Sequence, residues 1–280
     1  KRAYADSRLL QEMCVGEPYG VPRLGNEQIA AALHPQLVWE AYRQLIASSR
    51  LEIFYSGSAE QSRVEDALRS ALADLPRTEE TTPLEQTRHA LPEEPRLITE
   101  RLDVTQGKLG MGFSCGSQDA AALLVGNTLF GGSSNSKLFL NVREKLSLCY
   151  YASSLYHRQK GLITVSSGIE FENYQKAYDE ILAQLEAVQK GQLEDWELEA
   201  ARSTLLNAYA SMGDSQGKLE NFYLGQAATG RDETPEILAD QVRSVTLERI
   251  LSAMGTVKLD TVYFLQGKEA EARDPFYTRA

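Results

Sequence analysis

One stretch of the chain carries the most information about fold and function: Gly131-Gly132-Ser133-Ser134-Asn135-Ser136-Lys137-Leu138-Phe139-Leu140-Asn141-Val142-Arg143-Glu144-Lys145-Leu146-Ser147-Leu148-Cys149-Tyr150-Tyr151. The glycines and serines predict a tight turn, and the apolar spacing that follows predicts a short amphipathic helix ending in Arg-Glu-Lys. The aromatic run from Tyr150 to Ser154 predicts a strand. Arg143 and Tyr150 lie seven positions apart, on either side of the junction between helix and strand.

This layout resembles the signature of the second domain of pitrilysin/insulinase-type zinc metallopeptidases, which share the fold of mitochondrial processing peptidase. In that family an arginine and a tyrosine with this spacing face the active site across a cleft, which implies that role for Arg143 and Tyr150. The zinc motif of the family, H-x-x-E-H, occurs nowhere in the 280 residues. The resemblance therefore implies a bacterial paralogue that lacks the zinc motif, or the C-terminal portion of a longer peptidase.

Charge and composition exclude several classes of partner. The chain carries 29 basic and 39 acidic residues, for a net charge of −10, and an acidic surface repels phosphate backbones and anionic lipid. We therefore expect neither nucleic acid nor membrane as a partner. Three cysteines without a C-x-x-C pair predict reduced, buried thiols, and with no apparent leader they favour a cytoplasmic location.

The order of predicted elements indicates an α+β fold. Strands are expected at Leu102 to Val104, Leu109 to Phe113, Tyr150 to Tyr156, Leu162 to Ser167 and Thr261 to Leu265, with four or five helices between Tyr174 and Met254. Helices that cluster after strands, rather than alternating with them, predict an antiparallel-rich sheet with helices packed on one face.

A weak internal repeat suggests two tandem domains. Shifting the chain by 210 positions places Leu37 on Leu247, Phe54 on Phe264 and Gly57 on Gly267, so that a helix, a strand and a glycine occur twice. This predicts a strand from Leu51 to Tyr55. The proline-punctuated, polar stretch that follows predicts a linker.

The expected domains follow from the repeat and from the resemblance. Residues 1–75 would be the back portion of a first metallopeptidase-like domain, residues 76–98 a linker, and residues 99–280 a complete second domain that holds no zinc.

Two short motifs have simpler explanations than the ones they first suggest. The segment from Gly126 to Ser133 has glycine where a P-loop requires lysine, so it is more simply a turn and a helix cap. Gly112-Phe113-Ser114-Cys115-Gly116 fits the G-x-S-x-G nucleophile elbow, which would make Ser114 a hydrolase nucleophile. The only histidine after it, His157, lies in a predicted strand and not in a late loop, so this hypothesis ranks third.

The spacing of metal-ligating residues predicts no metal site in this chain. No histidine has a second histidine one helical turn away, and the cysteines are isolated in sequence. His89 has Glu93 four positions on, but Pro92 and Pro95 disfavour a helix there. Zinc is expected only on an upstream part of a longer protein or on a partner subunit.

The leading prediction is a non-catalytic, substrate-binding half or subunit of a zinc peptidase system. It would enclose an extended peptide or small protein, contribute Arg143 and Tyr150 to the cleft, and form a dimer with a catalytic paralogue or act with its own upstream domain. The alternative is a non-proteolytic scaffold with the same fold, in which Arg143 satisfies helix-end carbonyls and Tyr150 is an ordinary strand residue. In either case the chain alone is predicted to be inactive.

Overall fold

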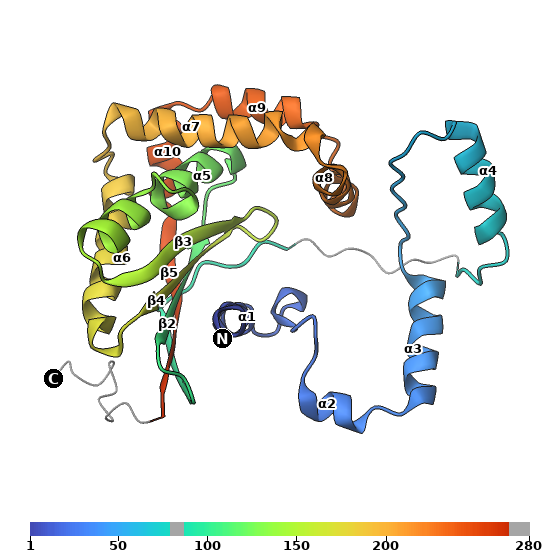
Figure 1. The fold of residues 1–280 in the computed structure, drawn as a ribbon, viewed down its shortest axis with the longest axis horizontal. Helices are drawn as coiled ribbons and strands as arrows, with labels where there is room; N and C mark the ends of the chain where they lie inside the picture. Colours follow the sequence, from blue (N-terminus) through green and yellow to red (C-terminus); the bar gives the residue numbers. More distant parts are fainter. Residues whose placement is uncertain (79–86, 269–280) are drawn as a thin grey trace. The chain divides into compact units, whose positions relative to one another are not determined.

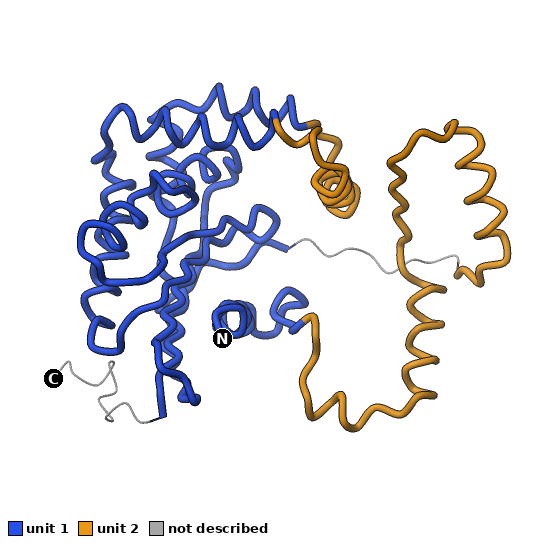
Figure 2. Tube along the Cα trace, viewed as in Figure 1, with its two compact units in different colours: residues 1–22, 87–210, 235–280 blue, residues 23–86, 211–234 orange. Residues whose placement is uncertain are grey.

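The computed structural model describes residues 1–78 and 87–268. The chain forms two compact units (Figure 2). Unit 1 comprises residues 1–22, 87–210 and 235–280, and unit 2 comprises residues 23–86 and 211–234. Among the described residues, no helix is long and apolar enough to cross a membrane.

Unit 1 is built on a five-stranded sheet with the order β1-β5-β2-β4-β3. The strands are β1 (Arg96–Leu102), β2 (Gly107–Cys115), β3 (Cys149–His157), β4 (Leu162–Ile169) and β5 (Val257–Gly267). Only the β1–β5 pair is parallel, and the other three pairs are antiparallel. The predicted antiparallel-rich sheet is therefore confirmed, although β1 shares only Leu102 with the strand predicted from Leu102 to Val104.

Helices and short helical segments of unit 1 lie between and around these strands. They are α1 (Arg2–Met13), η1 (Pro18–Gly20), α5 (Ala120–Asn127), η2 (Thr128–Gly132), η3 (Leu138–Lys145), η4 (Phe171–Asn173), α6 (Tyr174–Gln189), α7 (Asp195–Ala210), α9 (Pro235–Arg243) and α10 (Leu247–Met254). The main core includes apolar residues of α5, α6 and α10 together with one face of the sheet. This is the helical layer that the sequence predicted, and the α+β class is confirmed.

Alternation along β5 divides the core into two layers. Val262 and Phe264 belong to the main core under the helical layer, whereas Tyr263 and Leu265 form a second cluster with Leu9 of α1. Helix α1 therefore covers the sheet face opposite α5 and α6 (Figure 1).

Glycines in β2 allow α1 to approach the sheet. A Cβ atom on Gly112 would lie 2.5 Å from Met13 Sδ, and one on Gly110 would lie 3.2 Å from a methyl carbon of Leu9. Ala5, Leu9 and Met13 are the buried residues of α1 and are spaced four apart, so they form one apolar stripe. The spacing of the apolar stripe alone does not show which face of the sheet α1 covers.

Unit 2 contains helices but no strand among its described residues. Its elements are α2 (Glu27–Ala32), α3 (Pro35–Ser48), α4 (Gln61–Leu72), η5 (Met212–Asp214) and α8 (Gln216–Ala228), and none of these has a buried residue. The predicted strand from Leu51 to Tyr55 is wrong as a strand, because no described segment pairs with it. Phe54 in this segment stacks on Tyr223 of α8, with ring centroids 6.1 Å apart.

Part of the predicted linker, residues 79–86, lies outside the described residues. The next residues are bound to unit 1: Arg88 donates to the carbonyl oxygens of Cys115 and Ser117, and the His89 backbone N–H donates to the Lys160 carbonyl. The sequence did not predict these contacts with unit 1, because backbone and charged groups make them and no regular spacing of apolar residues marks the segment. The predicted tandem domains and their boundaries stay a prediction.

Candidate functional site

The glycine-rich segment before Arg143 packs closely on strand β3. A Cβ atom on Gly131 would lie 2.8 Å from the backbone nitrogen of Ser154 and 2.6 Å from a methyl carbon of Leu138. A side chain at Gly131 would thus force the segment away from the sheet. The glycine serves close packing, which is consistent with rejecting the phosphate-loop interpretation.

The predicted amphipathic helix is a π-helical segment, η3. π-Helical geometry is rare and is found frequently at functional sites. After η3 the chain turns sharply: the Leu148 N–H donates to the Val142 carbonyl, and Ser147 adopts a φ of 49°. A non-glycine residue in this left-handed region carries conformational strain, and this turn is what brings Arg143 near Tyr150.

A β-bulge sets the direction of Tyr150. The β3–β4 register passes from Cys149 opposite Ile169 to Tyr151 opposite Gly168, so Tyr150 is the extra residue. Bulges of this kind re-aim a side chain. The Tyr150 ring is 60% exposed, whereas Arg2 of α1 lies over the Tyr151 ring, 4.1 Å from its centroid.

Arg143 and Tyr150 line the same pocket, whose volume is about 440 Å³. The remaining lining residues are Glu144, Ser147, Leu148, Cys149, Glu170 and Asn173. The resemblance implied that Arg143 and Tyr150 face one cleft, and their contribution to such a cleft stays a prediction. Their role toward a peptide stays a prediction.

Both polar ends have partners within the chain. The Arg143 guanidinium lies over the Phe139 ring, 4.7 Å from its centroid, and 3.5 Å from a carboxylate oxygen of Glu144. The Tyr150 hydroxyl donates to the Glu170 carboxylate, and this hydrogen bond raises the pKa of the phenol. Sequence reasoning missed Glu170, because only strand pairing places it beside Tyr150.

Ser114 does not occupy a nucleophile elbow. It lies within β2, is fully buried, and donates from Oγ to Asp260 Oδ2 at 2.6 Å. His157, the proposed base, contacts the Tyr19 hydroxyl through Nδ1 and the Thr164 hydroxyl through Nε2. The serine-hydrolase hypothesis, which ranked third, is therefore not supported, since both nitrogens of the candidate base have other partners.

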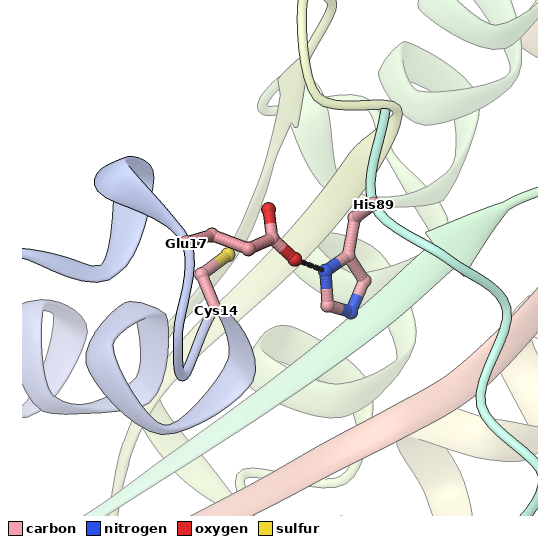
Figure 3. A group of neighbouring side chains, drawn as sticks. All are labelled: Cys14, Glu17 and His89. Carbon is pink, nitrogen blue, oxygen red and sulfur yellow. Dashed lines mark hydrogen bonds and ion pairs between the residues drawn. The ribbon is translucent and has the colours of Figure 1, made fainter. Parts of the chain in front are cut away.

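A second polar cluster joins residues distant in sequence: Cys14, Glu17 and His89 (Figure 3). His89 Nδ1 lies 2.5 Å from Glu17 Oε1, and His89 Nε2 lies 3.0 Å from Asp260 Oδ2. Hydrogen bonds to Asp260 and Cys14 raise the pKa of His89 to about 10. The spacing rules for metal ligands could not find this cluster, because position 89 reaches positions 14 and 17 only through the fold. The predicted absence of a metal stays a prediction.

Burial and hydrogen bonding act in opposite directions on the carboxyl groups of this cluster. Burial alone would raise the pKa of Asp260, but hydrogen bonds from His89, Ser114 and Thr261 outweigh it and lower that pKa. The pKa of Glu17 is lowered in the same way, against burial, by Lys160 and His89. Both carboxylates are therefore ionised at neutral pH.

The chain belongs to the family described as Peptidase M16 inactive domain, which matches residues 32–205. It is 34% identical over 275 residues to the probable inactive metalloprotease YmfF of Bacillus subtilis, covering 96% of this chain and 64% of that protein. A second B. subtilis protein, the uncharacterized zinc protease YmxG, is 23% identical over 241 residues, covering 82% of this chain and 57% of that protein. The chain thus spans less than two thirds of either relative.

A solved structure shares the fold across nearly the whole chain. A conserved protein from Enterococcus faecalis V583 is 27% identical and has a TM-score of 0.84, covering 96% of this chain and 64% of that one. The family membership confirms the resemblance that the Gly131–Tyr151 stretch suggested, and it makes this chain an inactive, M16-type peptidase domain.

Proposed function

We propose that this chain is the non-catalytic, substrate-binding half of a pitrilysin/insulinase-type zinc peptidase, and that Arg143 and Tyr150 contact an extended peptide. The observation that carries this proposal is the shared pocket of about 440 Å³ that both side chains line. A guanidinium and a phenol are donors suited to a peptide carbonyl or to the oxyanion that develops from it. On binding, the peptide would replace Glu144 as the partner of Arg143 and Glu170 as the partner of Tyr150.

The sheet edge next to this pocket supports an extended substrate. Strand β3 is one of the two edge strands of the sheet, and Tyr150 lies near its beginning. A peptide that adds to such an edge gains backbone hydrogen bonds along its length, while pockets beside the edge select its side chains. The substrate class that fits is an extended peptide or a small protein with an exposed extended segment.

The catalytic zinc and its general base would come from outside this chain. The source would be residues upstream of Lys1 in a longer protein or a paralogous catalytic subunit, with a dimer as the working form. Both B. subtilis relatives are longer than this chain, which leaves room for such a domain. A cytoplasmic location belongs to the same proposal and rests on the three unpaired cysteines.

A scaffold without a role in proteolysis is the second candidate. The specific observation in its favour is that Arg143 and Tyr150 already have partners, Glu144 and Glu170, within the chain. On this hypothesis the pair stabilises the turn around Ser147 and touches no substrate.

Two substitutions separate these candidates. With the catalytic partner present, Arg143→Ala and Tyr150→Phe should each lower peptide turnover by roughly tenfold to thousandfold, the range for loss of one transition-state donor, and should leave thermal unfolding nearly unchanged. Tyr151→Phe is the matched control, because its ring lies under Arg2 and not in the pocket. Parental turnover in both variants, or a loss of stability without a specific loss of turnover, would favour the scaffold.

A further inference from the structure

We propose that Cys14, Glu17 and His89 bind a zinc ion at a site separate from the Arg143/Tyr150 pocket. One ligand atom from each residue lies within 4.8 Å of the others (Figure 3). Tetrahedral zinc holds sulfur, nitrogen and oxygen ligands at about 2.0–2.3 Å, which places the ligand atoms roughly 3.5 Å apart. The ligand atoms would approach one another by up to about 1.3 Å to close the site.

The surroundings of His89 match the support that a metal-binding histidine receives. Its Nε2 lies 3.0 Å from Asp260 Oδ2, which directs Nδ1 toward Glu17 and Cys14. Asp260 is 2% exposed and is itself fixed, accepting from Ser114 Oγ at 2.6 Å and from Thr261 Oγ1 at 2.7 Å. A carboxylate on the far nitrogen fixes the tautomer of a metal-bound histidine and increases its basicity.

The chemistry of the donors favours zinc over harder cations. A thiolate, an imidazole and one carboxylate suit zinc, whereas magnesium and calcium prefer oxygen ligands. Cys14 is fully buried, and the side chains of His89 and Glu17 are 12% and 25% exposed. His89 also borders a pocket of about 580 Å³, which it lines together with Asp260.

The ammonium of Lys160 lies beside these ligands but occupies only one oxygen of the Glu17 carboxylate, so the other oxygen is available to a metal ion. Its ammonium pairs with Glu17 Oε2 and donates to the Thr87 carbonyl at 2.6 Å, whereas the other oxygen, Oε1, faces His89. Zinc binding would release one proton from the Cys14 thiol and one from the His89 ring into the buffer. Two protons leave as one divalent ion enters, so the net charge of the cluster is unchanged.

An ion at this site would fasten three parts of unit 1 to one another. Cys14 follows α1, Glu17 precedes η1, and His89 lies a few residues before β1. The ion would therefore hold the N-terminal segment on the sheet face that α1 covers. The ion would hold this segment in place, and a water molecule would fill the fourth position of its tetrahedral shell.

Metal analysis of the tag-free 280-residue chain, purified without chelator and then titrated with zinc, tests the proposal. We expect one zinc per chain, a higher unfolding temperature with zinc, and a thiolate-to-metal charge-transfer band when cobalt(II) replaces zinc. Cys14→Ser should abolish that band, and the matched control Cys149→Ser should retain it, because Cys149 lies at the other pocket. Asp260→Asn should weaken zinc binding by about 10–100-fold.

A folded parent chain that holds no zinc after titration and dialysis, or whose cobalt spectrum shows no thiolate band, would overturn the proposal. That result would identify the cluster as an ion-paired network of His89, Glu17 and Asp260 only. Because this readout uses the unmodified chain, it decides the question even if a variant fails to fold. A thiolate band that persists in Cys14→Ser and disappears in Cys149→Ser would also overturn the assignment.

Discussion

At the scale of single residues, Tyr150 is held by the partner that a substrate would have to replace. The bulge directs its ring outward, and its hydroxyl donates to the Glu170 carboxylate. Ionising the phenol would break this hydrogen bond and place two negative charges side by side, which is why the pKa of Tyr150 is raised. Glu170 therefore controls whether the Tyr150 donor is free.

Glu170→Gln should lower the pKa of Tyr150 toward its ordinary value of 10.0, because the neighbouring negative charge is removed. A pH titration of isotope-labelled tyrosine by NMR, with Tyr150→Phe used to assign the signal, measures this change. Glu172→Gln is the matched control and should have a much smaller effect, since Glu172 contributes least to the shift. An unchanged Tyr150 titration in Glu170→Gln would show that the hydrogen bond does not persist in solution.

The two polar sites differ in how far sequence could predict them. Arg143 and Tyr150 are seven positions apart, so one helix end and one strand start bring them together, and a local pattern is sufficient. Cys14 and His89 meet only because α1 lies on the sheet and the segment before β1 passes beside it. Because these two residues are far apart in sequence, no local spacing of ligand residues predicts that they lie close together.

At the scale of elements, strands with partners inside the described chain were predictable. β2, β4 and β5 contain the expected β-rich runs, and the alternation in β5 divides its residues between two layers. The segment from Leu51 to Tyr55 has the same composition but no partner, and composition alone cannot supply the missing hydrogen bonds. Strand propensity thus predicted which segments can form a strand, but not whether a neighbouring strand is present to pair with them.

One carboxylate, Glu100 of β1, links α1 to the sheet through hydrogen bonds. It accepts hydrogen bonds from Tyr4 of α1 and Tyr263 of β5, each at 2.6 Å, and from Arg8 of α1 at 3.3 Å. Burial alone would raise the pKa of Glu100, but the hydrogen bonds from Tyr263, Tyr4 and Arg8 lower it. The carboxylate form is therefore the one that the folded state favours.

Glu100→Gln should destabilise unit 1 by about 1–3 kcal/mol at neutral pH, because a charge-assisted network is lost. The pKa of Glu100 is depressed on folding, so its contribution is present above the ordinary value of 4.5 and is lost as pH falls through the folded pKa. Urea unfolding of parent and variant between about pH 7 and pH 3 should show the difference shrinking toward acid.

The control for this measurement is Glu186→Gln. Glu186 is 57% exposed and pairs with Lys190 on the surface of α6, so its replacement should change stability by less than about 1 kcal/mol at any pH. Equal stability of the parent and Glu100→Gln at neutral pH would show that apolar contacts of Leu9 and its neighbours hold α1 without this carboxylate.

At the scale of the whole molecule, each unit receives a helix from the other half of the sequence. Unit 1 includes α1 from the N-terminal segment, and unit 2 includes α8 from residues 211–234. A shift of 210 positions carries 2–13 onto 212–223, which overlaps α8. Leu9 of α1 packs with Tyr263 of β5, and Tyr223 of α8 stacks on Phe54, so a helix lies against a β-forming segment in both units. The predicted duplication itself stays a prediction.

Because α1 packs on the sheet and α8 stacks on the Phe54 segment, we expect the chain before residue 79 and the chain after residue 86 to stay bound after the link between them is cut. If a specific protease site is inserted between residues 79 and 86 and cut, the two fragments should co-elute in gel filtration. The N-terminal fragment would keep α1 on the sheet, and the C-terminal fragment would keep α8 on the Phe54 segment.

Leu9→Ala should weaken the association of the two fragments at least tenfold, because deleting a buried leucine costs about 2–5 kcal/mol. The control Val15→Ala, at a side chain that is 65% exposed, should leave it unchanged. Fragments that separate after cleavage of the otherwise unmodified chain would show that neither α1 nor α8 binds tightly to the other fragment.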